Sequence, residues 1–93
     1  MKKNVLHILV SNKLSGAENV VCNIIENDNF YNMYYCSPKG EINEVLKEKN
    51  IKYIELKNIK KIIQENKIDV ATISNVLFSI NNKEYTNYFI YTL

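Results

Sequence analysis

Apolar residues follow two alternating patterns along the first three-quarters of the chain. Short, nearly continuous apolar runs are typical of strands buried on both faces of a parallel sheet. Between them, apolar residues recur at spacings of three and four, the period of an amphipathic helix. The predicted strands cover residues 4–10, 30–36, 51–56 and 68–74. This alternation predicts a Rossmann-like, three-layer α/β domain: a parallel sheet, right-handed crossovers, helices on both faces and the usual strand order 3-2-1-4.

The first predicted helix begins at a polar signal. Ser15 is followed three residues later by Glu18, the spacing of a capping box, in which each side chain satisfies a free backbone N–H group. The polar residues 27–29 end the helix. Its apolar stripe, which we expect to be buried, consists of Ala17, Val20, Val21, Ile24 and Ile25.

Two shorter helices are predicted further along the chain. One follows the turn at residues 37–40 and is expected to stop at Asn50, because asparagine tolerates a left-handed backbone. The other is expected to be capped by Asn58, whose side chain can accept a hydrogen bond from the first turn. Each helix precedes one of the predicted strands, as a parallel sheet requires.

The last 19 residues, 75–93, follow the alternating pattern less closely and form a divergent tail. Residues 76–80 can open a fourth helix, and residues 81–84 form a turn or loop. The apolar and aromatic residues 88–93 predict a fifth strand at an edge of the sheet. All 93 residues are therefore expected to form a single domain.

Composition narrows the classes of function. Hydrophobic residues make up 46% of the chain and charged residues 24%, values that are ordinary for a soluble globular protein. The net charge is only +2 and all 12 basic residues are lysine, so the bidentate arginine contacts of nucleic-acid recognition are absent. With only Gly16 and Gly40, the chain has neither a Walker phosphate loop nor the Gly-x-Gly-x-x-Gly turn of dinucleotide-binding proteins.

The residues that most often carry chemistry are expected to be structural. His7, the only histidine, lies inside the first predicted strand and is expected to be packed and hydrogen-bonded. Cys22 and Cys36 are expected to be free thiols that fill space in the core, since two cysteines and one histidine are too few for a zinc site. We therefore expect neither a metal nor a cofactor. No apolar run approaches the length of a membrane span, so the chain is expected in the cytoplasm, with no integral membrane segment.

A ligand site is expected where two loops meet. In an open parallel sheet, ligands bind beyond the carboxyl ends of the strands, at the point where the strand order reverses. The loop at residues 11–16 and the end of the fourth strand flank this crevice. The polar residues that these segments contribute would suit sugar hydroxyls or a phosphate: Asn12, Lys13, Ser15, Gly16, Ser74 and Asn75. These residues include no carboxylate pair, activated nucleophile or metal cluster, so we assign no catalytic residue.

Several segments together resemble one enzyme family. They are Val5-Leu6-His7-Ile8-Leu9, Ser15-Gly16-Ala17-Glu18, Tyr35-Cys36-Ser37-Pro38-Lys39-Gly40, Asn50-Ile51-Lys52-Tyr53-Ile54 and Ile68-Asp69-Val70. In this order and spacing they are similar to the N-terminal domain of a family 4 glycosyltransferase, a two-domain retaining enzyme of the GT-B fold. The resemblance covers about three-quarters of the chain.

The resemblance implies a function and also its limits. Intact relatives transfer a sugar from a nucleotide-sugar donor to an acceptor hydroxyl, and their N-terminal domain mainly receives the acceptor. The resemblance suggests a role in bacterial surface-glycan synthesis. The family's strand-four histidines correspond here to Thr72 and Ser74, and its donor-binding C-terminal domain is missing. The chain is therefore expected to be a truncated half of such an enzyme, inactive alone.

The resemblance also implies partners. The expected partners are a nucleotide sugar or acceptor glycan and a separately encoded donor domain. The expected location is the inner face of the membrane, which the weak positive charge of the chain would suit. The alternative is a non-catalytic Rossmann-like module that binds a partner protein or a small anion.

Overall fold

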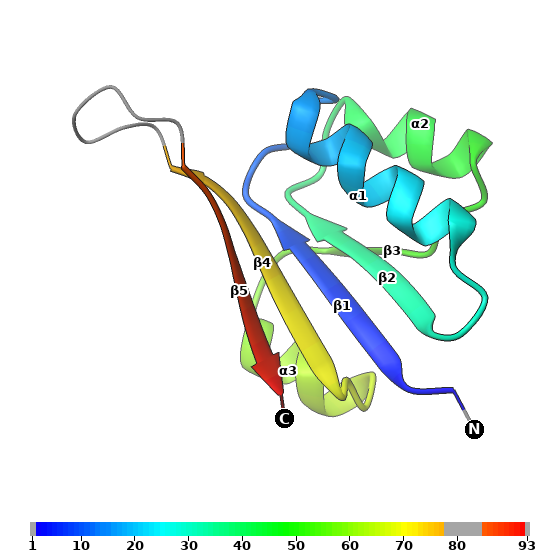
Figure 1. Ribbon diagram of the computed structural model, residues 1–93, viewed down its shortest axis with the longest axis vertical. Coiled ribbons are helices and arrows are strands. Elements are labelled where there is room, and N and C mark those ends of the chain that lie inside the picture. The colour runs from blue at the N-terminus through cyan, green and yellow to red at the C-terminus, as the bar shows by residue number, and fades with distance from the viewer. Residues whose placement is uncertain (1, 78–84, 93) are drawn as a thin grey trace.

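The computed structural model describes residues 2–77 and 85–92 of the chain. Strands and helices alternate until the last two strands, as Figure 1 shows. The elements are β1 (Asn4–Leu9), α1 (Gly16–Asn27), β2 (Asn32–Ser37), α2 (Ile42–Glu48), β3 (Tyr53–Glu55), α3 (Ile59–Glu65), β4 (Val70–Leu77) and β5 (Tyr85–Thr92).

The five strands form one sheet in the order β3-β2-β1-β4-β5. The first four strands are parallel, which confirms the predicted α/β class and the order 3-2-1-4. The fifth strand pairs antiparallel with β4 and lies at the sheet edge. Since β1 pairs with β2 on one side and β4 on the other, the strand order reverses at β1.

Helices lie on both faces of this sheet, and a separate core fills each side (Figure 1). Successive side chains of a strand point to opposite faces, so β1 and β2 contribute to both cores. The core beneath α1 and α2 contains Leu9, Val21, Cys22, Tyr35, Ile42, Leu46 and Ile51. The core beneath α3 contains Leu6, Ile8, Cys36, Ile62, Ile68 and Ala71.

Helix α1 buries a different face from the predicted stripe. Val21 is buried and Ile25 half-buried, but Val20 and Ile24 are 45% and 41% exposed. Glu18 and Cys22 are buried in their place. The prediction was therefore wrong for Val20 and Ile24, because α1 is rotated toward the neighbouring helix α2.

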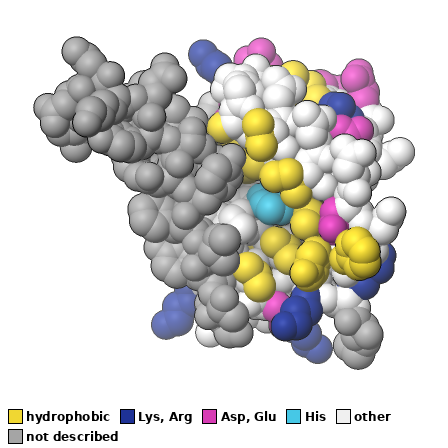
Figure 2. Space-filling view, in the orientation of Figure 1, with side chains coloured by type: hydrophobic (Ala, Val, Ile, Leu, Met, Phe, Trp, Pro, Cys, Tyr) yellow, Lys and Arg dark blue, Asp and Glu magenta, His cyan; other side chains and the backbone are white. Residues whose placement is uncertain are grey.

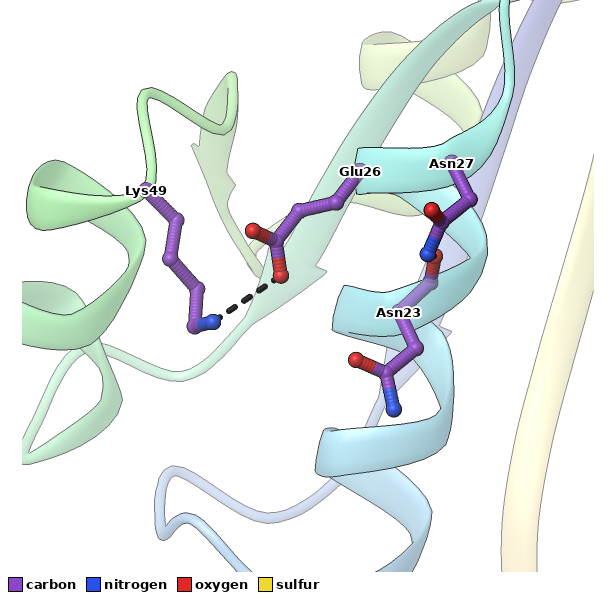
Figure 3. Close-up of polar contacts among 4 residues, drawn as sticks. All are labelled: Asn23, Glu26, Asn27 and Lys49. Atoms are coloured by element: carbon purple, nitrogen blue, oxygen red, sulfur yellow. Dashed lines mark hydrogen bonds and ion pairs between the residues drawn. The ribbon is translucent and has the colours of Figure 1, made fainter.

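An ion pair marks the side of α1 that faces α2. Lys49, at the end of α2, donates to a Glu26 carboxylate oxygen of α1 over 2.9 Å (Figure 3). Residues 20 and 24 lie on the flank of α1 that points away from this pair, given 3.6 residues per turn. That flank therefore lies beside the part of the sheet that α2 does not cover.

Several element ends follow the predicted local chemistry. Asn50 ends α2 with a left-handed backbone (φ 56°), and the Asn58 side chain accepts a hydrogen bond from the Lys61 N–H at 3.2 Å. The start of β2 is later than predicted. The Asp28 carboxylate accepts hydrogen bonds from the backbone of Phe30 and Tyr31, which holds them in a turn and leaves Phe30 80% exposed.

The carboxyl-terminal segment also differs from its prediction. β4 continues to Leu77, so residues 74 and 75 lie within a strand and not in a loop. Residues 76 and 77 extend β4, which contradicts a helix over 76–80 in its first two positions. The rest of that helix and the turn at 81–84 lie outside the described residues. The fifth strand is longer than predicted, beginning at Tyr85.

Candidate functional site

The edge of the sheet where the ligand site was predicted is built from the ends of β1 and β4 and the loop that follows β1. β1 and β4 run parallel, and Leu9 at the end of β1 lies opposite Ser74. The loop that leaves β1 and the end of β4 therefore meet at one edge. This edge is also the switch point of the strand order, where open α/β sheets bind their ligands.

Ser74 and Asn75 reach this edge as strand residues. They pair with Tyr88 and Asn87 of β5, and β4 extends beyond the end of β1. β4 therefore borders this edge as a strand, where a loop was predicted.

Asn12 connects two loops. Its side-chain amide donates to the Lys39 carbonyl at 3.1 Å, and its own carbonyl accepts from the Ile42 N–H, at the start of α2, at 2.8 Å. A Cβ atom at Gly40 would lie 2.3 Å from the Asn12 Nδ2 atom. Asn12 therefore acts first as a structural clamp. The sequence did not predict the part played by Gly40, although the turn predicted at residues 37–40 ends at this glycine.

Ser15 and Glu18 form the predicted capping box at the start of α1. The Glu18 carboxylate accepts from the Ser15 N–H at 3.0 Å and also from the Ser15 hydroxyl. Glu18 is only 3% exposed, so a carboxylate is held at the helix N-terminus. This charge favours the helix dipole and disfavours a phosphate at the same position.

Lys13 and Gly16 are exposed members of the predicted site, as is Ser15. The Lys13 backbone N–H donates to the Ser11 hydroxyl at 3.2 Å, which shapes the loop. A Cβ atom at Gly16 would meet nothing within 4 Å, so open space lies in front of the first turn of α1. A ligand can therefore approach this backbone closely.

His7 lies within the sheet, away from the loop, as predicted. Its Nδ1 atom is 2.7 Å from the Thr72 hydroxyl oxygen and its Nε2 atom is 3.4 Å from the Met33 sulfur. Burial lowers the pKa of His7 to about 4, although the Asp28 charge opposes this shift. The ring is therefore neutral at pH 7. The Thr72 hydroxyl is therefore engaged with His7 within the sheet.

Neither cysteine is suited to nucleophilic chemistry. Both are buried and free, and burial raises the pKa of Cys36 to about 11 and raises that of Cys22 as well. The Tyr35 hydroxyl is also buried, with no hydrogen-bond partner, and its pKa is raised by burial. Within residues 2–77 and 85–92 no group of three or more His, Cys, Asp or Glu side chains could hold a metal ion.

A hollow of about 390 Å³ lies where β3 leads into α3. Two loose ion pairs line it, Lys57 with Glu55 and Lys61 with Glu65, each at 3.8 Å. These side chains are largely exposed, so the pairs stabilise little and the hollow is an open, charge-balanced surface. It lies apart from the loop that leaves β1.

Comparison with protein-family models, with curated proteins and with solved structures found no match. Among the helices that the structure describes, none is long and apolar enough to cross a membrane.

Proposed function

We propose that this chain is the acceptor-side half of a GT-B glycosyltransferase, similar to family 4, and that it binds a hydroxyl-rich acceptor at the loop of residues 11–16. In this proposal these 93 residues are inactive alone, because the resemblance implies that the donor site lies in a second domain. Transfer would require a donor-binding domain that supplies the nucleotide sugar.

One observation carries the proposal: the opposition of Leu9 and Ser74 in parallel strands. It brings the loop after β1 and the end of β4 to the same edge, at the switch point where such sheets bind ligands. The resemblance in sequence covers the same segments, including residues 15–18 at the start of α1.

Two features favour an acceptor over a phosphate at this edge. The Glu18 carboxylate is buried at the start of α1 and already accepts from Ser15. A second negative charge beside it would be repelled, whereas sugar hydroxyls can donate to carbonyl and hydroxyl oxygens of the loop. The open space in front of Gly16 leaves the backbone accessible to such a ligand.

Backbone NMR titration tests this proposal. Neutral oligosaccharides and UDP-glucose would each be added to the ¹⁵N-labelled chain. We expect oligosaccharides to shift the amide signals of residues 11–18, and UDP-glucose to shift them less. If no oligosaccharide moves these signals, or if the 93 residues transfer sugar without a second domain, the proposal is wrong.

Matched variants locate the response. Gly16→Val fills the space in front of α1 and should weaken the oligosaccharide response. Lys61→Ala, on the exposed side of α3, should leave it unchanged. An equal loss in both variants would mean that the signals report general unfolding or non-specific binding.

The exposed flank of α1 favours a second candidate function, a non-catalytic module that binds a partner protein. Val20 and Ile24 on α1, and Leu14 just before it, are all more than one-third exposed. In Figure 2 hydrophobic side chains lie above and below the histidine on this face. Oligosaccharide binding that shifts the signals of residues 11–18 and leaves those of residues 20–24 unchanged would support the first candidate. Binding of a purified partner protein that is abolished by Val20→Asp, without any saccharide response or sugar transfer, would support the second.

A further inference from the structure

The outer edge of β5 has no neighbouring strand among the described residues. β5 is last in the order β3-β2-β1-β4-β5 and pairs with β4 only. In an antiparallel strand, alternate residues direct their N–H and C=O groups to opposite sides. About half of the eight residues of β5 therefore direct backbone hydrogen-bonding groups outward.

The two edges of the sheet differ in how they are protected. β3, at the other edge, has three residues and carries charges in and beside it, at Lys52, Glu55 and Lys57. Short, charged edge strands resist pairing with another chain. β5 has eight residues with no charge, no proline and no glycine, and all but Asn87 are aromatic or β-branched. Such residues favour strand pairing.

We propose that β5 is an interaction surface for a second copy of this chain, and that two β5 strands pair antiparallel about a two-fold axis. The sheet would then continue from one copy into the other. This pairing is self-complementary, because each strand offers the same outward groups to the other, and it closes after two copies.

Charge favours a second copy as the occupant. In every register of two antiparallel β5 strands, no charged residue opposes another, so like-charge repulsion across the ladder is absent. The net charge of +2 on each copy is also too small to keep two copies apart. The proposal is independent of any ligand at the loop after β1.

Sedimentation velocity over a wide range of concentrations tests the proposal on the chain as it is. We expect a monomer of 10.9 kDa that converts to a species of twice that mass as the concentration rises. A monomer at every concentration would overturn the proposal. Growth without limit to larger species would overturn it too, since two-fold pairing consumes the edge.

Charge variants identify the edge involved. In the register centred on residue 89, in which seven of the eight residues of each β5 strand are paired, residue 86 of one copy lies opposite residue 92 of the other. Thr86→Lys with Thr92→Lys, and Thr86→Glu with Thr92→Glu, should each raise the dissociation constant at least about tenfold through like-charge pairs. An equimolar mixture of the two variants should form dimers again, because opposite charges then meet. This rescue also demonstrates that both variants are folded.

The opposite edge supplies the control. Glu55→Lys changes the charge of β3 and should leave the dimer unaffected. Loss of the dimer in Glu55→Lys, or a mixture of the two β5 variants that stays monomeric, would exclude pairing through β5.

Discussion

The side-chain amide of Asn12 lies against the α-carbon of Gly40, 28 positions further along the chain. A Cβ atom on residue 40 would come within 2.3 Å of Asn12 Nδ2 and 2.6 Å of its Cγ. The same asparagine is hydrogen-bonded to the Lys39 carbonyl and to the start of α2. The two loops at the carboxyl edge of β1 and β2 are therefore held together by a close contact that requires glycine.

Gly40→Ala should consequently lower the free energy of unfolding by about 1–3 kcal/mol, because Asn12 must leave its position and lose its hydrogen bonds. Urea unfolding followed by circular dichroism measures this change. The double variant Asn12→Ala with Gly40→Ala should be less destabilised than the sum of the single variants, since the clash is then absent. Additive effects would contradict the contact.

Gly16→Ala should change the free energy of unfolding in the opposite direction. No atom lies within 4 Å of the added methyl group, and alanine has fewer unfolded conformations and a higher helix propensity than glycine. We expect the chain to be more stable by about 0.5 kcal/mol, visible as a higher Tm. A loss of stability would mean that the space in front of α1 is occupied.

The buried imidazole of His7 predicts a pH dependence of stability. Its pKa is about 4 in the folded chain and near 6.5 in the unfolded chain, so the unfolded state binds more protons between these values. Stability should be fully present above pH 6.5 and fall as the pH decreases toward 4, by about 3 kcal/mol in all. Urea unfolding at a series of pH values measures the slope.

His7→Gln provides the comparison for that experiment. Glutamine can still meet the Thr72 hydroxyl but does not titrate. The variant should lose the slope between pH 6.5 and 5. An unchanged slope would assign the pH dependence to other groups.

Neighbouring valines on α1 give a matched test of which helix face is buried. Val21 is 1% exposed and packs in the core beneath α1, whereas Val20 is 45% exposed. Val21→Ala should lower the free energy of unfolding by about 2 kcal/mol, and Val20→Ala by about 0.5 kcal/mol or less. Equal effects would mean that Val20 is covered in solution.

Local patterns were sufficient to predict the parallel strands and most of the helix ends, because these depend on short-range chemistry. The strand order followed from the usual topology of such sheets. Asn50 and Asn58 act where their side-chain and backbone preferences placed them. The rotation of α1 could not be predicted in this way. Val20 and Val21 are equally apolar, and only the position of α2 decides which one the core receives.

In the candidate site, too, contacts between residues close in sequence were predicted and contacts between distant residues were not. Ser15 and Glu18 are three apart in sequence, and their capping box was predicted correctly. The clamp between Asn12 and Gly40 joins two loops that are distant in sequence, so spacing gave no sign of it. The extension of β4 through Ser74 and Asn75 depends on pairing with β5, which is also a non-local contact.

The sheet separates two cores that have no buried side chain in common. Repacking on one side should therefore leave the other untouched, and double-mutant cycles between Val21 and Ile62 should be close to additive while those between Val21 and Leu46 should not. A protein engineer could redesign the core beneath α1 and α2 independently and keep the core beneath α3 unchanged.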